Sequence, residues 1–173
     1  MDTYYTIEEK YLQAVEELNY GETPKSLHLL NDIIQTEPLY ARARYQLGLI
    51  YYYNVGDYQT AGYHLKLCAE LEPLFPDVYL PYLELLVFLN MENLAASVSK
   101  KALQVPGVNH SGIYEQLGLM AEKNNNWAIA TEMYRKALLA SSSKKQVSAM
   151  EENIERIALK VRSTQAYAYS LAE

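Results

Sequence analysis

Residues 44–51 read Arg-Tyr-Gln-Leu-Gly-Leu-Ile-Tyr, and the central pair Leu47-Gly48 returns seventy residues later as Leu117-Gly118. Other small residues keep a related rhythm. Ser26, Ala61, Ala95 and Ala130 stand 35, 34 and 35 residues apart, and Ile33, Cys68, Ala102 and Ala137 have the same three intervals. A period near 34 residues is typical of a chain built from stacked copies of one small unit. This repeat decides the fold before any other motif is considered.

Apolar residues with helical spacing run along the chain. Tyr11, Ala14, Val15 and Leu18 follow the i, i+3, i+4, i+7 rule, as do Tyr79, Tyr82, Leu83 and Leu86. Short turns rich in Asn and Gly separate these segments, and Pro38, Pro73 and Pro106 mark the ends of the second helices. Since no segment alternates with a period of two, we predict no sheet. The pattern predicts an all-α protein made of antiparallel helix pairs.

Each repeat resembles the tetratricopeptide repeat, whose pattern is a large residue, Leu-Gly, a tyrosine, then Ala-x-x-x-Phe and a late proline. The second repeat reads Arg44-x-x-Leu47-Gly48-x-x-Tyr51, Ala61-x-x-x-Leu65-x-x-Cys68 and Pro73, and the fourth reads Tyr114-x-x-Leu117-Gly118-x-x-Ala121, Trp127 and Ala130-x-x-x-Tyr134-x-x-Ala137. The first repeat is a weaker match. The third departs most, because Tyr82-Leu83 replaces Leu-Gly.

The resemblance implies a right-handed superhelical array of antiparallel helix pairs, a tetratricopeptide-like α-solenoid. We predict one domain over residues 1–173, with repeats at 8–40, 41–75, 76–110 and 111–143, a capping helix over 143–165 and a tail over 166–173. The capping helix is predicted from one apolar stripe: Val147, Met150, Ile154, Ile157 and Val161. A partner-binding amphipathic helix is the alternative for this segment.

Composition narrows the setting of the protein. No stretch of the 173 residues approaches the roughly 18 uncharged apolar residues that span a bilayer, so no membrane partner is expected. Residues 1–5 show no signal-peptide pattern, and the single Cys68 excludes an internal disulfide, so we predict a cytoplasmic location. Residues 1–37 hold eight acidic and two basic residues, which accounts for the whole net charge of −6. This acidic end argues against nucleic acid as a partner, and is either a solvated face or a dock for a basic partner.

No constellation of residues points to chemistry. His28, His64 and His110 are far apart, no Cys/His cluster suggests a metal, and no Gly-rich loop suggests a phosphate. Cys68 occupies a small-residue packing position, which favours a buried, inert thiol. We therefore predict no catalytic residues, no cofactor, no metal and no enzyme activity.

Tyrosine marks the surface that remains. Nine of the seventeen tyrosines lie between residues 40 and 82. In tetratricopeptide proteins, a second stripe on the first helix of each repeat lines a concave groove that binds a peptide or a helix. Position by position, the resemblance places these residues on that wall: Tyr45, Leu49, Tyr52 and Tyr53, then Leu80, Glu84, Val87 and Phe88, then Glu115, Leu119, Glu122 and Lys123, with Leu12, Glu16 and Tyr20 at its beginning.

Two interpretations of these tyrosines stay open. They fill gaps in the core, which we favour for Tyr51, or they bind a partner. For Tyr45 and Tyr52 the two interpretations are equally open, because their stripe has no obvious intramolecular partner. Family members that clamp a terminal carboxylate use basic side chains, whereas this wall carries Leu, Tyr and Glu. We therefore predict a protein or peptide partner with apolar anchors and a basic residue that answers the glutamates. A small chaperone of a secretion or assembly system, and a homodimer or self-associating scaffold, are the alternatives.

Overall fold

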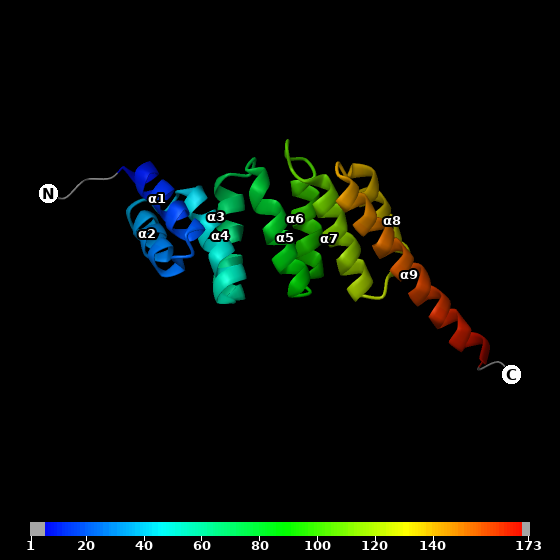
Figure 1. Cartoon of the computed structure of the whole chain (residues 1–173). Coiled ribbons are helices and arrows are strands. Elements are labelled where there is room, and N and C mark those ends of the chain that lie inside the picture. Colours follow the sequence, from blue (N-terminus) through cyan, green and yellow to red (C-terminus); the bar gives the residue numbers. More distant parts are fainter. Residues whose placement is uncertain (1–5, 171–173) are drawn as a thin grey trace. The chain divides into compact units, whose positions relative to one another are not determined.

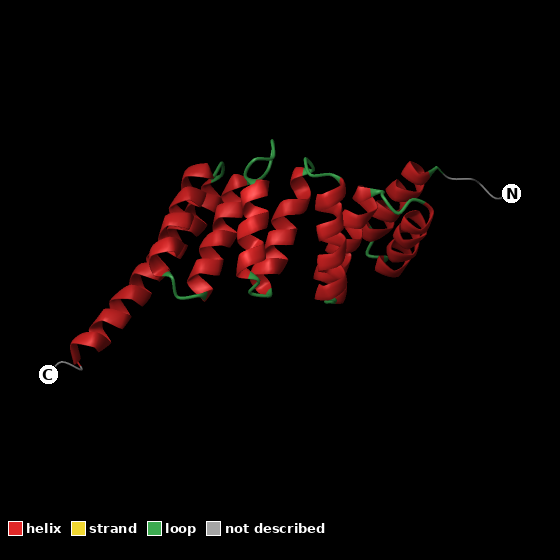
Figure 2. Cartoon of the chain, turned by 180° about the vertical axis from the view of Figure 1, so that it is seen from behind, coloured by secondary structure: helices red, strands yellow, loops and turns green. Residues whose placement is uncertain are grey.

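The computed structural model describes residues 6–170, with side chains through residue 164. These residues form helices joined by short loops and contain no strand (Figures 1 and 2). The elements are α1 (Ile7–Asn19), α2 (Thr23–Thr36), α3 (Ala41–Ile50), the π-helical turn η1 (Tyr51–Val55), α4 (Tyr58–Leu71), the 3₁₀ turn η2 (Pro76–Val78), α5 (Tyr79–Phe88), α6 (Glu92–Ala102), α7 (His110–Lys123), α8 (Trp127–Ala140) and α9 (Lys144–Ser170). The all-α prediction is confirmed. The segment read for a signal peptide, residues 1–5, lies outside the described residues.

The chain divides into two compact units, residues 1–85 (unit 1) and 86–173 (unit 2). In unit 1, α1 packs on α2, α2 on α3, and α3 on α4. In unit 2, α6 packs on α7, α7 on α8, and α8 on α9. The division falls inside α5, just after the Tyr82-Leu83 pair that replaces Leu-Gly. The single domain over the whole chain stays a prediction.

The turns within the helix pairs repeat the rhythm of the sequence in their backbone angles. Gly21, Gly56, Asn90 and Asn125 have φ angles of 83°, 79°, 56° and 58°. They stand 35, 34 and 35 residues apart, as the small core residues do. This left-handed conformation is open to glycine and tolerated by asparagine, whose short polar side chain can bond locally. The Asn- and Gly-rich punctuation therefore falls where the helices reverse.

The small residues of the repeat lie in the core. Ser26, Ala61, Ala95 and Ala130 are 0% exposed, and Ile33, Cys68, Ala102 and Ala137 are at most 1% exposed. A Cβ atom on Gly48 would lie 2.6 Å from Leu65 Cγ, and one on Gly118 would lie 2.8 Å from the Tyr134 ring. Glycine is thus required where α3 meets α4 and where α7 meets α8, as the Leu-Gly repeat predicts.

Arg44, His64 and Cys68 are structural residues of the α3–α4 pair. Arg44 donates to the Pro38 carbonyl oxygen from Nε (3.2 Å) and Nη2 (3.0 Å) and lies 3.4 Å from His64 Nδ1. Burial, together with the Arg44 charge, lowers the pKa of His64 to about 4, so the ring is neutral and accepts from Arg44. Burial also raises the pKa of the Cys68 thiol to about 12. The prediction of a buried, inert thiol is confirmed.

Helix α9 covers α8 with the predicted apolar stripe. Met150 and Ile157 are 1% exposed and pack with Ala130, Tyr134 and Ala137, and Ile154 and Val161 add partly buried contacts. The predicted capping helix is present over 144–165 and continues to Ser170 through part of the predicted tail. Residues 171–173 lie outside the described part of the chain.

Candidate partner-binding surface

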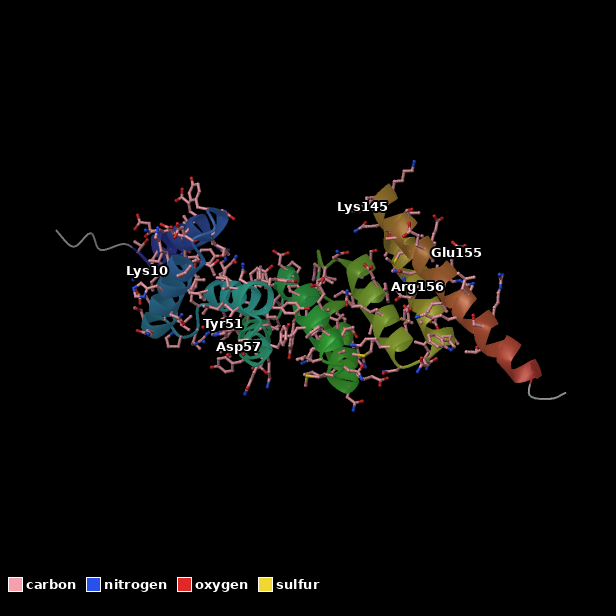
Figure 3. All side chains as sticks on the ribbon, turned by 60° about the horizontal axis from the view of Figure 1, so that its bottom comes forward. Lys10, Tyr51, Asp57, Lys145, Glu155 and Arg156 are labelled. Carbon is pink, nitrogen blue, oxygen red and sulfur yellow. The ribbon has the colours of Figure 1, made fainter. Side chains whose placement is uncertain are left out.

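Nine of the residues predicted to line the wall belong to unit 1, and we call the six that lie on α3, η1 and α5 the tyrosine surface. Tyr45 and Leu49 come from α3, Tyr52 and Tyr53 from η1, and Leu80 and Glu84 from α5. Tyr53 is 59% exposed and the other five are partly exposed. Tyr51, the residue before Tyr52, stacks instead on His64 of α4 with ring centroids 5.8 Å apart. Figure 3 labels its position on the chain.

Glu84 is the charged residue of the tyrosine surface. The Tyr53 hydroxyl donates to Glu84 Oε2 at 2.5 Å, and the Tyr52 and Tyr53 rings lie 4.4 Å apart at 39°. Burial is the first cause that raises the pKa of Tyr45, Tyr52 and Tyr53, and the Glu84 charge raises all three further. The three phenols are therefore neutral at pH 7, and Tyr53 is the one whose hydroxyl donates to the Glu84 carboxylate.

Tyr45 has a partner that the sequence did not reveal. Its ring meets Phe75 edge to face, with centroids 5.1 Å apart at 87°. Tyr11 and Tyr40, 34 and 35 residues earlier, form the equivalent contact at 5.7 Å and 61°. The interpretation that the Tyr45 stripe lacks an intramolecular partner is wrong for this residue. Tyr45 supports the repeat as well as facing solvent.

The remaining predicted residues belong to unit 2, where Val87 is 1% exposed and its predicted place on the wall is corrected, because the side chain lies in the core. Phe88 is 54% exposed, Leu119 is 37% exposed, and Glu115 is partly buried. Lys123 is the last residue of α7, and its Nζ donates to the carbonyl oxygens of Val87 (2.6 Å) and Phe88 (3.1 Å). Its charge therefore caps the end of α5.

Glu122 does not offer a carboxylate to a partner. It is 7% exposed and accepts from Arg156 Nε (2.9 Å) and Nη2 (2.7 Å), Lys160 Nζ (2.6 Å) and the Tyr134 hydroxyl (2.8 Å). Arg156 reaches it from α9 (Figure 3). The Arg156 hydrogen bonds, with Lys160 and Tyr134, outweigh burial and lower the pKa of Glu122 to about 2. Its predicted place on the binding wall is corrected, because the carboxylate is used to hold α9 against α7 and α8.

Each unit has one further surface feature, exposed apolar side chains on unit 1 and a cavity in unit 2. In unit 1 the residues expected to begin the wall are exposed, with Leu12 at 59% and Tyr20 at 77%. In unit 2 a cavity of about 360 Å³ opens between α6, α7 and α8, lined by Leu117, Met120, Ile129 and Met133 among others. Its lining comes from three helices, so no single stripe in the sequence pointed to it.

Neither a cluster of metal-ligating side chains nor a membrane-spanning helix is present among the described residues. Among residues 6–170, no group of three or more His, Cys, Asp or Glu is placed to hold a metal ion. In the same part of the chain, no helix is long and apolar enough to cross a bilayer.

Comparison with solved structures finds this helix-pair fold in other proteins. MamA from Desulfovibrio magneticus RS-1, from its residue 41 to its end, matches with a TM-score of 0.70 at 18% identity, covering 95% of this chain and 96% of that one. PilW, a widely conserved type IV pilus biogenesis factor, matches with a TM-score of 0.70 at 16% identity, covering 91% and 76%. No protein-family model and no curated protein matches the sequence. At these identities the likeness establishes the fold alone, and the tetratricopeptide-like fold expected from the sequence is confirmed.

Proposed function

We propose that the chain is a non-enzymatic protein-interaction module that binds a peptide or a helix of its partner on the tyrosine surface of unit 1. The observation that carries the proposal is the cluster of Tyr52, Tyr53 and Glu84, in which two adjacent rings and a carboxylate stand partly exposed together. A tyrosine gives a large contact area at low cost in side-chain entropy, and its hydroxyl pairs with polar groups. Such a cluster suits a partner that offers an apolar side chain to the rings and a polar group to the hydroxyls or the carboxylate.

Charge supports the same assignment. Unit 1 holds thirteen acidic and five basic residues, a net charge of −8, while unit 2 has a net charge of +2. A field of this sign speeds the approach of a basic partner and disfavours acidic ones. Phe88, Glu115 and Leu119 of unit 2 are proposed as further contacts, and Glu122 is left out of this set. PilW is described as a biogenesis factor, which makes a role in assembly a reasonable form of the same function.

The test begins with peptides selected from a random library on the immobilised wild-type protein. We expect Tyr52→Ala to weaken their binding by about tenfold or more, since aromatic anchors carry much of such binding energy. Tyr63→Ala is the control, because Tyr63 is a 58% exposed tyrosine on α4, outside the tyrosine surface. Kd values from fluorescence anisotropy, with melting curves to verify folding, are the measurement. Equal Kd values for wild type and Tyr52→Ala would show that the surface is misassigned.

The same variants separate the alternatives. Loss of a dimer on size-exclusion chromatography with Tyr52→Ala, without loss of peptide binding, favours self-association. Loss of solubility of one client protein favours a chaperone. The cytoplasmic location, predicted from the single cysteine and from the lack of a signal-peptide pattern in residues 1–5, stays a prediction.

A further inference from the structure

Three tyrosine hydroxyls in the described chain donate to a glutamate carboxylate on another helix or turn. Tyr40 donates to Glu8 Oε2 at 2.6 Å, and Tyr134 donates to Glu122 Oε2 at 2.8 Å. Tyr53 donates to Glu84 Oε2 at 2.5 Å. In each pair one carboxylate oxygen is fixed by a phenol, and the carboxylate still has capacity for a cation.

In two of these pairs a guanidinium occupies the other oxygen. Arg42 Nη1 lies 3.5 Å from Glu8 Oε1, and Arg156 Nε donates to Glu122 Oε1 at 2.9 Å. The planar guanidinium matches a carboxylate because it presents parallel N–H donors. The chain therefore uses the same group, Tyr–Glu–Arg, in both units.

The third pair lacks its arginine within unit 1. All five basic residues of unit 1 are engaged elsewhere: Lys10 with Asp32, Lys25 with Glu17 and Glu22, Arg42 with Glu8, Arg44 with Pro38 and His64, and Lys66 with Glu70. Among the described residues of unit 1 (6–85), no ion pair to Glu84 is formed. Glu84 is partly exposed, and the 59% exposed Tyr53 ring lies beside it.

We propose that Glu84, Tyr52 and Tyr53 form a seat for an arginine side chain of the bound partner, which completes the third Tyr–Glu–Arg group. This inference rests on the proposed function. Arginine fits better than lysine because its flat guanidinium stacks on an exposed tyrosine ring while it donates to Glu84 Oε1. Lysine offers a compact, strongly hydrated charge that gains less from the ring. The net charge of −8 on unit 1 favours either cation over a neutral side chain.

The direct test uses small probes and the full chain. N-acetyl-arginine amide is titrated into the ¹⁵N-labelled protein, and amide shifts of Tyr52, Tyr53 and Glu84 are followed. We expect saturable shifts with this probe and at least about tenfold weaker ones with N-acetyl-citrulline amide, which keeps the shape and loses the charge. Glu84→Gln abolishes them, whereas Glu70→Gln, an equal change of charge on α4, leaves them. Equal shifts with the citrulline probe or with N-acetyl-lysine amide, or no shifts at all, overturn the proposal.

Stability provides a second, independent readout. The amide oxygen of Gln still accepts from Tyr53, and the Glu84 carboxylate has no cation within unit 1. Glu84→Gln is therefore expected to lower the melting temperature much less than Glu122→Gln, which removes the partner of Arg156. A drop in melting temperature as large as that of Glu122→Gln would show that Glu84 is used within the chain and would refute the seat.

The library peptides distinguish this inference from the proposed function. If they depend on Tyr52 and lose at least tenfold in affinity when their arginine is replaced by citrulline, both stand. If they depend on Tyr52 and tolerate citrulline equally, the arginine seat fails and the proposed function survives. If the binding of the peptides does not depend on Tyr52, the proposed function fails, and the arginine seat, which rests on it, fails with it.

Discussion

Ser26 occupies the core position that alanine fills in the other helix pairs, and its hydroxyl is buried without a hydrogen-bond partner among the described residues. A buried hydroxyl that has lost water and gained no partner destabilises the folded state. We expect Ser26→Ala to raise the free energy of unfolding by about 1 kcal/mol, measured by urea unfolding at pH 7.

Ser99→Ala is the matched control for this prediction. Ser99 is 3% exposed, but its hydroxyl donates to the Ala96 carbonyl oxygen at 3.0 Å. Removing a satisfied hydroxyl is expected to be neutral or to cost up to about 1 kcal/mol. A loss of stability in Ser26→Ala would mean that its hydroxyl has a partner in solution.

Glu122 makes the stability of the chain depend on pH. Its pKa is lowered to about 2 in the folded protein, from an ordinary value of 4.5. The folded state therefore binds fewer protons than the unfolded chain between these values, so the contribution is complete above pH 4.5 and is lost as the pH falls toward 2. We expect Glu122→Gln to lower the free energy of unfolding at pH 7 by as much as about 3 kcal/mol.

Urea unfolding of both proteins at pH 7 and pH 3 isolates this contribution. His64, whose pKa is lowered to about 4, also costs stability as the pH falls, but it is present in both proteins. The gap between wild type and Glu122→Gln should therefore shrink at pH 3. A gap of constant size would contradict the ion pairs as the source of stability.

Within the helix pairs, glycine sets how closely α7 approaches α8. A Cβ on Gly118 would lie 2.8 Å from the Tyr134 ring, and that ring is held in place by its hydrogen bond to Glu122. The ring has little freedom to move away, so we expect Gly118→Ala to lower the free energy of unfolding by about 1–3 kcal/mol. Thermal unfolding followed by circular dichroism at 222 nm measures the effect.

Gly62 provides the control at the element scale. It lies inside α4, where an added Cβ would meet Leu85 Cδ2 at an ordinary 3.6 Å. Because alanine is the better helix former, Gly62→Ala is expected to stabilise by up to about 1 kcal/mol. If both substitutions stabilised the protein, overpacking at Gly118 would be excluded.

Helix positions and turns were predictable because each depends on residues near in sequence. The Leu-Gly pairs, the prolines and the Asn- or Gly-rich turns all report local geometry that recurs at one period. The π-helical turn at Tyr51–Val55 was not predictable. Its wider turn changes the angle between successive side chains, so a projection at 3.6 residues per turn misplaces Tyr52 and Tyr53 relative to α3.

At the scale of the molecule, the candidate site was only partly predictable, for a related reason. The family resemblance assigned Tyr52, Tyr53 and Glu84 to one wall, and in the structure Tyr53 contacts both of the others. Apolar periodicity selects only a face of a helix. It carries no information on which charged residues meet from distant helices. Glu122 and Arg156 are 34 residues apart in the sequence, and in the structure they form an ion pair in which the carboxylate is buried and the guanidinium is partly exposed.

Local packing in a repeat protein predicts that damage stays local. Each helix contacts mainly its neighbours, so stability is close to a sum of helix-pair terms and their interfaces. Glu122→Gln removes the polar contact that joins α7, α8 and α9 in unit 2. Native-state hydrogen exchange should show lower protection of amides in α7–α9 and unchanged protection in α1 and α2. Glu70→Gln, which affects only an exposed pair with Lys66, is the control. An equal loss of protection across all helices would show instead that residues 1–173 unfold as one cooperative domain, as the sequence predicted.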